Sequence, residues 1–380
     1  MTPLRINVVL GPFLPTLPGP AGAIEKLWQG IAEHLAQTGH QVTLVARRYE
    51  DQPTHETLQG VRYLRRSGYT RTNRTAPDLA RDLAYSFRIL AALPPADITV
   101  TNAFFLPTLL AWRKRRTGRV VVNVQRYPKK QMWLYDRVDR LSSVSQAVAD
   151  EIVRQRPSLK PIVGVVPNPV DVDVFAPPAQ PIDRPPTTLA FHGRVHPEKG
   201  LHLLVEAFAR LHAQHPQLKL KLIGPTATEH GGGGQPYLDR LATLAGPAPV
   251  EFVAPIRDPA QLAQALRDAD LYCYPSMADL GESFGVSPLE AMAVGLPTVV
   301  SALACFREFA DDDVNALVFD HNAPDAVDRL EAALLRLLQE PDTRRRLAQA
   351  GIDKADAFSY PRVASAYERD FLSLVHTPPT

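Results

Sequence analysis

The chain has 380 residues, of which 45% are hydrophobic and 22% charged, which is enough for two domains with separate cores and excludes global disorder. Its 42 lysine and arginine residues balance 40 aspartate and glutamate residues, so the formal net charge of +2 gives no indication of a protein built around nucleic acid. The two cysteines, Cys273 and Cys305, lie far apart in apolar segments, which excludes a disulfide framework or a cysteine zinc site and favours a reducing cytosol. The apolar run before Gly11 is too short for a signal peptide and far shorter than the ~20 residues of a membrane span. We therefore expect a soluble or at most a peripheral membrane protein.

The first part of the chain predicts a strand, a loop and a helix. Residues 5–10 (RINVVL) are typical of a buried strand, and residues 11–22 form a loop rich in proline and glycine. Apolar residues then recur at i, i+3, i+4, i+7 and i+11, which predicts an amphipathic helix that ends before Gly39. Further apolar runs alternate with helical stretches, as expected of a parallel sheet, and they occupy residues 41–46, 97–101, 119–124 and 141–145.

The opening pattern recurs after a proline-rich segment. Residues 167–186 contain seven prolines and no predicted element longer than a turn, which indicates an interdomain linker. Beyond it, a strand at 188–192, a loop at 193–200 and a helix lead to a strand at 218–223. We therefore predict an α/β protein with two doubly wound, Rossmann-like domains that face each other across a cleft. The glycine tract at 231–234 predicts a flexible loop tip.

Two carboxylates follow the predicted strand at residues 271–274. Glu282 lies in the loop after this strand, and Glu290 lies near the start of the next helix. In that helix we expect Ser287 as the N-cap, Pro288 at the first position and Glu290 at the third. Open parallel sheets bind ligands at the carboxyl ends of their strands, where such carboxylates can accept hydrogen bonds from sugar hydroxyl groups. A capping box alone also accounts for Glu290.

Glu282 and Glu290, in the setting ESFGVSPLEAMAVGLP, resemble the E-x7-E signature of retaining glycosyltransferase family 4, whose members have the two-domain GT-B fold. Other matches occur in the family's order and extend over nearly the whole chain. They are the linker entry (167–175), the donor-phosphate loop with its helix (193–211) and the C-terminal helix that crosses back to the first domain (358–371). The resemblance implies an acceptor-binding domain at 1–175, joined by the returning helix at 360–380, and a donor-binding domain at 176–359.

The resemblance also implies roles for single residues. Arg194 and Lys199 match the basic pair that holds the donor diphosphate, and a guanidinium fork with an ammonium group suits that task. Glu282 matches the residue that faces the transferred sugar, and Glu290 matches the residue that binds the nucleotide ribose. Arg194, Lys199 and Glu282 are the expected catalytic residues. The expected donor-binding residues are Gly22, Gly193, Ile256, Glu282, Phe284, Gly285, Val286 and Glu290.

Several of these assignments concern the backbone. The N–H groups of Phe284, Gly285 and Val286 can meet an anion at the start of their helix. Gly22 matches the glycine loop that lets the sugar and diphosphate approach the first helix, and Ile256 lies where the family's backbone usually meets the base.

The chain departs from the family pattern at some positions. Ala23 replaces the usual second glycine of the first loop. Gln125 stands where a histidine is often found, against the donor sugar or the catalytic centre, so either the sugar differs or the activity is altered. The expected acceptor residues are Phe104, Gln125, Tyr127 and Lys129.

The resemblance implies a retaining, metal-independent enzyme without a cofactor. It would transfer a hexosyl group from a nucleotide diphosphate sugar, with UDP- or GDP-hexose as the expected donor, to a hydroxyl acceptor in glycan, lipopolysaccharide or glycolipid assembly. Lipid-linked glycans are among the candidate acceptors. The expected location of the protein is the cytoplasm or the inner face of the membrane. The basic stretch 113–119, with Lys129 and Lys130, either contacts an anionic membrane or acceptor or is a solvated helix end. Trp112 and Trp133 are candidates to line the acceptor site.

Two other functions are open at this point. The Gln125 substitution is compatible with a protein that binds nucleotide sugars without catalysing transfer. Residues 281–285 also spell G-x-S-x-G, the nucleophile elbow of α/β-hydrolases, with Ser283 as nucleophile and Asp320 and His321 downstream. The distance of this motif from its strand, and Pro288 after it, oppose that interpretation.

Two spacings that suggest metal sites have simpler explanations. His192 and His196 are interpreted as packing or loop histidines because no third ligand is evident. The D-x-D at 171–173 lies in the predicted linker, so we expect no dedicated metal ion.

Overall fold

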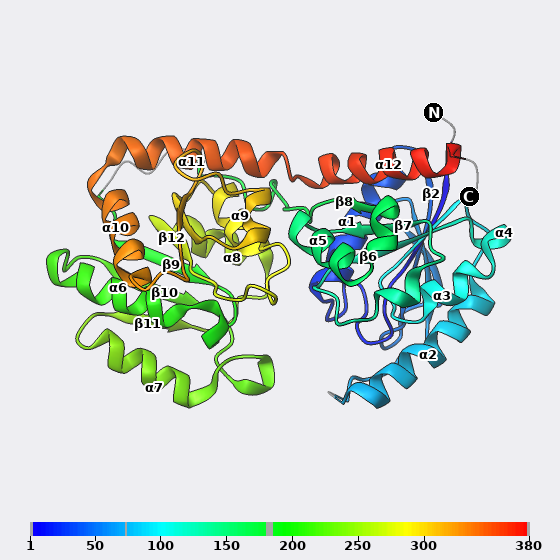
Figure 1. Cartoon of the computed structure of the whole chain (residues 1–380), viewed down its shortest axis with the longest axis horizontal. Coiled ribbons are helices and arrows are strands. Elements are labelled where there is room, and N and C mark those ends of the chain that lie inside the picture. Colours follow the sequence, from blue (N-terminus) through cyan, green and yellow to red (C-terminus); the bar gives the residue numbers. More distant parts are fainter. Residues whose placement is uncertain (1–2, 73, 180–184, 378–380) are drawn as a thin grey trace. The chain divides into compact units, whose positions relative to one another are not determined.

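The computed structural model describes residues 3–72, 74–179 and 185–377, and it divides the chain into two compact units. Unit 1 comprises Met1–Pro169 and Tyr360–Thr380, and unit 2 comprises Val170–Ser359. The chain thus passes into unit 2 after Pro169 rather than after residue 175. It returns to unit 1 in the last helix, α12 (Tyr360–His376), which is red in Figure 1.

Unit 1 is built on a sheet with the strand order β3-β4-β2-β1-β5-β6-β7-β8 among its described residues. Neighbouring strands are parallel except for the β3–β4 pair. The strands are β1 (Arg5–Val9), β2 (Gln41–Arg47), β3 (His55–Leu58), β4 (Val61–Arg66), β5 (Ile98–Thr101), β6 (Arg119–Val124), β7 (Arg140–Ser143) and β8 (Val163–Val165). The helices are α1 (Ala23–Gln37), α2 (Thr75–Ala92), α3 (Leu106–Ala111), α4 (Lys114–Thr117), η1 (Met132–Tyr135), α5 (Gln146–Gln155), η2 (Pro157–Ile162) and α12.

The core of unit 1 joins the two ends of the chain. The apolar stripe of α1 is buried, as its period predicts, and it packs on α12 through the rings of Trp28 and Tyr367, whose centroids lie 4.9 Å apart. Val363 and Phe371 of α12 are buried in the same cluster. The predicted returning helix therefore completes the hydrophobic core of unit 1, although residues 378–380 lie outside the described residues.

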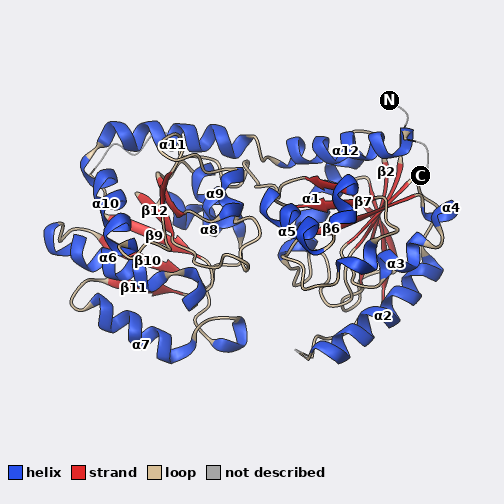
Figure 2. Ribbon diagram, viewed as in Figure 1, coloured by secondary structure: helices blue, strands red, loops and turns tan. Residues whose placement is uncertain are grey.

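Unit 2 contains a second sheet with the order β11-β10-β9-β12-β13-β14 among its described residues, and all neighbours are parallel. Its strands are β9 (Thr188–His192), β10 (Lys219–Ile223), β11 (Val250–Val253), β12 (Leu271–Tyr274), β13 (Thr298–Ser301) and β14 (Leu317–Phe319). Its helices are η3 (Pro197–Lys199), α6 (Leu201–Gln214), η4 (Thr228–His230), α7 (Gly234–Ala245), α8 (Pro259–Arg267), α9 (Val286–Ala293), η5 (Ala304–Glu308), α10 (Ala326–Gln339) and α11 (Pro341–Asp356). Helices flank each sheet (Figure 2), which explains why the parallel strands are continuous apolar runs.

The strand orders locate the crevice that each sheet offers to a ligand. In unit 1 the chain winds from β1 toward β2 on one side and returns to β5 on the other. In unit 2 the strands β10 and β12 flank β9 in the same way. Such a switch point opens a crevice beyond the carboxyl ends of the two strands. The ends of β1 and β5, and those of β9 and β12, are therefore the places to search for a site.

Most of the predicted linker is anchored to unit 2. Val170 forms a bridge with Ser359, and Phe175 is buried. The guanidinium of Arg267 donates hydrogen bonds of 2.8 Å to the carbonyl oxygens of Val174 and Ala176. The described part of this segment contains no helix or strand, as predicted, and a side chain distant in sequence binds its backbone. The part at 180–184 lies outside the described residues.

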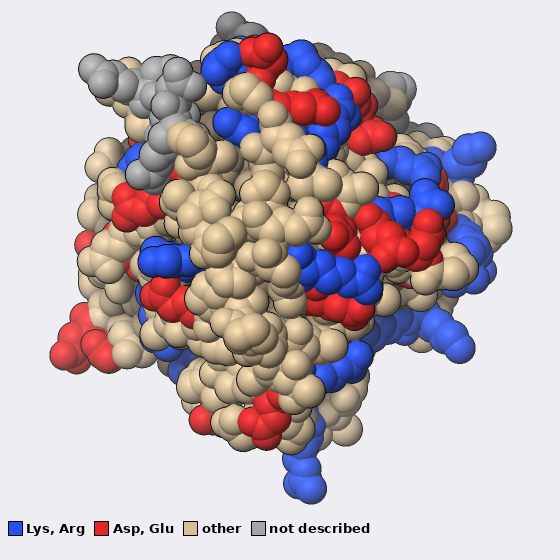
Figure 3. All heavy atoms as spheres, turned by 90° about the vertical axis from the view of Figure 1, so that its left-hand side faces the viewer, with Lys and Arg blue, Asp and Glu red and all other residues tan. Residues whose placement is uncertain are grey.

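The surface matches the balanced composition. On the face shown in Figure 3, basic and acidic side chains are interspersed around uncharged residues. In unit 2, for example, Arg210 of α6 pairs with Asp328 of α10 at 2.7 Å. None of the described helices is long and apolar enough to cross a membrane.

Candidate functional site

The predicted donor residues of unit 2 gather at the carboxyl ends of β9 and β12. The loop that follows β9 carries Arg194 and Lys199, and the loop that follows β12 carries Glu282. The two loops approach each other closely at Gly200. Its φ of +65° suits glycine, and a Cβ atom there would lie 2.0 Å from the carbonyl oxygen of Pro275.

Lys199 and Glu282 form a buried charged pair in this crevice. The Nζ of Lys199 lies 2.5 Å from Oε2 of Glu282, and the two side chains are only 8% and 13% exposed. The same carboxylate oxygen accepts hydrogen bonds from the hydroxyl groups of Tyr274 at 3.1 Å and Ser276 at 3.3 Å. Burial, and then the charge of Glu282, raise the pKa of Tyr274 well above its usual value, so this tyrosine remains a donor. Three donors thus fix one oxygen of Glu282.

Arg194 differs from Lys199 in its exposure. Its side chain is 44% exposed, pairs with Glu198 and donates a hydrogen bond of 3.2 Å to the carbonyl oxygen of Gly231. The pair that the sequence predicts therefore consists of one buried ammonium group and one accessible guanidinium group. An accessible guanidinium fork suits a diphosphate that arrives from solution.

Glu290 pairs with a residue that the sequence did not assign to the site. Its Oε2 lies 2.8 Å from Nε2 of His192, the last residue of β9. The interpretation of His192 as a packing or loop histidine is therefore incomplete, because the sheet order brings it to the carboxylate of α9. His196 is a loop histidine as predicted, and its Nδ1 accepts the backbone N–H of Glu198 at 3.3 Å.

The helix that carries Glu290 begins earlier than predicted. Gly285 precedes the first residue of α9 and has a φ of +93°, where an added Cβ would lie 2.5 Å from the ring of Phe306. Ser287 is therefore not the N-cap, and Glu290 lies beyond the first turn. The left-handed turn at Gly285 starts the helix, and Pro288 is tolerated because first-turn N–H groups have no intrahelical acceptor.

This start still provides a place for an anion. Val286 and Ser287 are the first residues of α9, so their N–H groups have no acceptor within the helix. The ring of Phe284 is buried and contacts the rings of Phe309 and Phe358, so Phe284 can contribute only its backbone to a ligand.

The glycine tract at 231–234 is part of the same edge and not the flexible tip that we predicted. Hydrogen bonds of 2.8 to 3.0 Å tie the N–H groups of all four glycines to backbone carbonyl oxygens. One of these bonds runs from Gly233 to Val195 in the Arg194 loop. A Cβ on Gly232 would lie 2.2 Å from the backbone of Thr226, so close packing explains the glycine there. Composition alone suggested flexibility because it does not show these partners.

Ile256 and Gly193 lie at the same edge of the sheet. Gly193 directly follows β9, and Ile256 lies in the loop between β11 and α8, two strands away from β9 in the sheet. Asp258 caps α8 by accepting the N–H of Gln261 at 2.9 Å and thereby fixes the end of that loop.

In unit 1, Gly22 lies at the start of α1 as predicted, but a carboxylate occupies the space beside it. Glu25 turns back over the helix start, and a Cβ on Gly22 would lie 2.6 Å from its Oε2. Burial is the main cause that raises the pKa of Glu25, and hydrogen bonds from the backbone of Glu25 and Gly22 oppose it in part. The carboxyl group of Glu25 thus already occupies the N-terminus of α1.

Gln125 belongs to a buried network centred on Asn123. The Oδ1 of Asn123 accepts hydrogen bonds from Trp28 at 3.1 Å, Asn102 at 2.8 Å and Gln125 at 2.7 Å. Its amide nitrogen donates to the hydroxyl oxygen of Tyr367 at 2.9 Å. The indole N–H can only donate, so it determines which side of the Asn123 amide is oxygen. Gln125 therefore presents its nitrogen to Asn123.

The other predicted acceptor residues follow the same two strands. Phe104 follows β5, donates its N–H to Asp82 at 3.2 Å and accepts the hydroxyl of Tyr135 at 3.0 Å. Tyr127 is partly buried after β6, and Lys129 is exposed there. The structure thus places all four predicted acceptor residues beyond the carboxyl ends of the adjacent strands β5 and β6.

The hydrolase alternative does not have the required geometry. The strand β12 ends at Tyr274, and Ser283 lies in a long loop instead of a sharp turn between strand and helix. The proposed partner His321 pairs with Asp279, at 3.3 Å between Nε2 and Oδ1. The serine motif is therefore not a nucleophile elbow.

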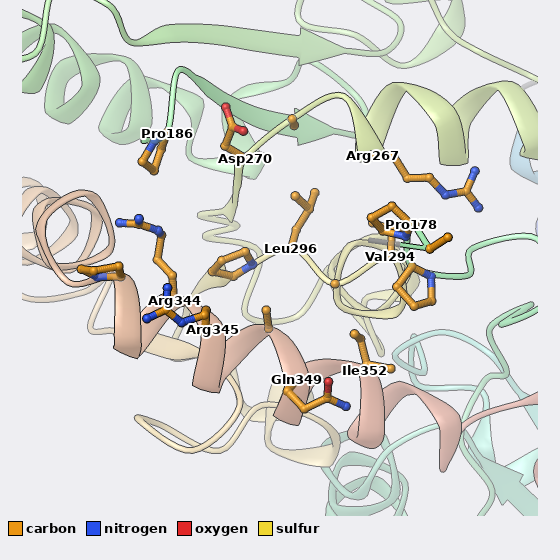
Figure 4. A pocket seen from close by; sticks show the side chains of 17 residues that line it. Pro178, Pro186, Arg267, Asp270, Val294, Leu296, Arg344, Arg345, Gln349 and Ile352 are labelled. Carbon is orange, nitrogen blue, oxygen red and sulfur yellow. The ribbon is translucent and has the colours of Figure 1, made fainter. Parts of the chain in front are cut away.

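A pocket of about 490 Å³ lies at the opposite edge of the sheet in unit 2 (Figure 4). Asp270 and Leu296, which precede β12 and β13, are among its lining residues. Asp270 accepts the backbone N–H groups of Thr187 and Thr188 at 2.8 and 2.9 Å, which is a structural role. This pocket is thus separate from the carboxylate and lysine cluster.

Comparison with known families covers both units. Residues 24–174 match the family model described as Glycosyltransferase Family 4, and residues 175–354 match the one described as Glycosyl transferases group 1. A D-inositol 3-phosphate glycosyltransferase from Kribbella flavida is 32% identical over 236 residues, which are 59% of this chain and 54% of the relative. A phosphatidyl-myo-inositol mannosyltransferase from Mycolicibacterium smegmatis is 32% identical over 208 residues, which are 54% and 50% of the two chains. The chain thus spans about half the length of these relatives.

Solved structures share the fold of the chain. Sucrose-phosphate synthase from Thermosynechococcus elongatus has a TM-score of 0.74 at 20% identity and covers 97% of this chain and 99% of its own. A structure described as trehalose-6-phosphate from E. coli bound with UDP-2-fluoro glucose has a TM-score of 0.74 at 16% identity, with 99% and 100% covered. At these identities the likeness concerns the fold, which is the GT-B fold that the sequence predicts.

Proposed function

Since the chain belongs to glycosyltransferase family 4 and has the GT-B fold, we propose that it transfers a hexosyl group from a nucleotide diphosphate sugar to a hydroxyl acceptor with retention of configuration. The observation that carries this proposal is the cluster of Lys199, Glu282 and Arg194 at the switch point of unit 2. It combines cations for a diphosphate with a fixed carboxylate for a sugar hydroxyl.

The chemistry at this cluster concerns the leaving group. When the bond between the anomeric carbon and the phosphate oxygen breaks, negative charge grows on the diphosphate. Arg194, Lys199 and the first N–H groups of α9 stabilise that charge, so no metal ion is needed in this proposal. The buried position of Lys199 makes its charge more effective than one in water.

The acceptor hydroxyl attacks on the face from which the diphosphate leaves. Its oxygen bonds to the anomeric carbon, and its proton passes to the leaving phosphate oxygen, so no protein base is required. Glu282, with one oxygen held by three donors, orients a hydroxyl of the transferred sugar through its carboxylate. Glu290 binds the nucleotide ribose.

We place the acceptor at unit 1, near Phe104, Gln125, Tyr127 and Lys129. Two of the relatives are named for inositol phosphate and phosphatidylinositol as substrates, which supports a glycolipid or its headgroup as the acceptor class. In this proposal the enzyme works in the cytoplasm, at the inner face of the membrane, in cell-envelope glycan assembly.

One surface of unit 1 supports contact with a membrane. Trp112 and Trp133 are 70% and 64% exposed, and the guanidinium of Arg137 lies 4.6 Å from the ring centroid of Trp112. Trp112 directly precedes the basic stretch 113–119. Indole rings beside basic residues suit the interface of an anionic bilayer.

The donor is identified by the nucleotide released from UDP-, GDP- and ADP-sugars in the presence of EDTA. We expect release from one donor, and its loss in Arg194→Ala and Glu290→Ala variants. Release that needs a divalent cation would contradict metal independence. Nucleotide binding without turnover, with a full panel of hydroxyl acceptors, would favour the non-catalytic binder.

The membrane surface is tested with vesicles. The double variant Trp112→Ala, Trp133→Ala should lose most sedimentation with vesicles of mixed phosphatidylglycerol and phosphatidylcholine. Phe87→Ala, which removes another exposed aromatic residue of unit 1, is the matched control and should bind like the natural chain. Equal binding of all three proteins would overturn this surface.

A further inference from the structure

The last residue of β9 occupies a central position in the candidate site without a role in the mechanism above. His192 is only 5% exposed, and its ring packs against Tyr272, with centroids 5.4 Å apart. Its Nε2 lies 2.8 Å from Oε2 of Glu290, which is 98 residues away in sequence. A buried polar ring at the end of the central strand therefore faces the carboxylate that we assign to the ribose.

The partner determines the form of the imidazole. An ionised carboxylate accepts hydrogen bonds and cannot donate them, so Nε2 of His192 carries the proton. Among the described residues, Nδ1 of His192 is buried without a hydrogen-bond partner. The ring thus directs its single hydrogen bond at Glu290, and it does not bridge Glu290 to the rest of the unit.

This contact limits what Glu290 can do. The side chain of Glu290 is 20% exposed, whereas that of His192 is 7% exposed, so the carboxylate is the accessible member of the pair. With Oε2 bound to the ring, the carboxylate is held in one orientation, and a ligand hydroxyl can be accepted by Oε1. A carboxylate held in this way accepts a ribose hydroxyl without first losing side-chain freedom.

We propose that His192 is a positioning residue that orients Glu290 and thereby sets the preference of the site for a nucleotide with an intact ribose. This inference rests on the proposed function, because it needs a nucleoside diphosphate in the site. It adds a residue to the site, since neither the family resemblance nor the relatives assign a role in nucleotide binding to His192. The expected contribution is about tenfold in the affinity for a ribonucleotide, the usual size of one hydrogen bond to a charged group.

The test compares two amide replacements of the ring. In His192→Gln the side-chain nitrogen reaches the position of Nε2 and can donate to Glu290. In His192→Asn the nitrogen reaches only the position of Nδ1, so the donor is lost although the residue stays polar. His212→Asn, at a partly buried histidine of α6 that bonds the carbonyl oxygen of Leu218, is the matched control.

The measurement is calorimetric binding of UDP, GDP and ADP to the full chain, repeated with the 2′,3′-dideoxy form of the nucleotide that binds best. For His192→Asn we expect about a tenfold loss for the ribonucleotide and no loss for the dideoxy form. His192→Gln and His212→Asn should keep the natural preference. Glu290→Gln should lose the preference as His192→Asn does.

The outcomes separate this inference from the proposed function. Equal losses for the two nucleotide forms in His192→Asn would show a structural role and overturn the inference, as would an unchanged preference. If the natural chain binds no nucleoside diphosphate, the proposed function fails, and the inference fails with it.

Discussion

The switch points of the two sheets have the same topology, but the side chains beside them differ in charge. At the ends of β9 and β12 in unit 2, charged groups pair in buried or half-buried positions, as Lys199 does with Glu282. In unit 1, next to the switch point of β1 and β5, neutral amide and indole groups surround Asn123 of β6. The fold thus decides where a ligand binds, and the side chains at those strand ends decide which ligand is suitable.

The starts of the helices differ in the same way. The first turn of α1 contains Glu25, whose carboxyl group already occupies the start of the helix. The first turn of α9 contains no acidic residue. An incoming phosphate therefore meets a carboxyl group at the start of α1 and no acidic side chain in the first turn of α9, which agrees with a division of the substrates between the units.

The strongest test of this contrast removes the buried cation of unit 2. Lys199→Ala should lower donor turnover by about 10² to 10³-fold, because it removes a positioned charge from the leaving group and leaves Glu282 without its counter-charge. Turnover is measured as nucleotide release. Lys219→Ala, at an exposed position of β10, is the control and should be unaffected.

A double variant distinguishes catalysis from stability at this pair. Lys199→Met with Glu282→Gln removes both charges, so thermal unfolding should recover relative to Lys199→Ala while turnover stays low. Recovery of turnover would contradict the role of the charges in catalysis.

The corresponding test in unit 1 removes the side-chain amide of Asn123 at the centre of its hydrogen-bond network. Asn123→Leu should lower the free energy of unfolding by about 3 kcal/mol, because Trp28, Asn102 and Gln125 lose a buried acceptor together. Chemical denaturation measures this loss. Tyr367→Phe removes one bond of the same network and should cost about 1 kcal/mol. Equal costs would mean that the network does not act through Asn123.

Arg194 sharpens the contrast within unit 2, because it is exposed where Lys199 is buried. Arg194→Ala should weaken nucleoside diphosphate binding about tenfold and leave the melting temperature unchanged, since an exposed ion pair contributes little to stability. Calorimetry and thermal unfolding of the same sample test both statements. A large fall in melting temperature would assign Arg194 a structural role.

The smallest effect concerns Glu25. Burial raises its pKa in the folded chain above the value of 4.5, so the folded state binds the proton more tightly than the unfolded state. The tighter proton binding stabilises the folded state below pH 4.5, and this contribution is lost as the pH rises through the pKa of Glu25 in the folded state. Glu25→Gln removes this dependence, so the variant should gain stability relative to the natural chain between pH 4 and pH 7. A constant difference across this range of pH would contradict the shift.

The sequence alone determined much of the architecture. The apolar runs of β1, β6 and β9, and the apolar stripe of α1, depend on neighbours along the chain, so the period of their apolar residues was sufficient to predict these elements. The spacing of Glu282 and Glu290 and the glycines near Arg194 identified the family, and the structure places these residues at one edge of one sheet.

The tertiary structure decided which groups meet. The contacts of His192 with Glu290, and of Trp28 with Asn123, join residues 98 and 95 positions apart, and only the strand order brings them together. The same holds for Gly233 of the glycine tract, which donates a hydrogen bond to Val195 of another loop, and for Gly285, whose neighbour is Phe306. Local patterns report backbone preference and burial, whereas hydrogen bonds between distant segments depend on packing that the sequence pattern does not contain.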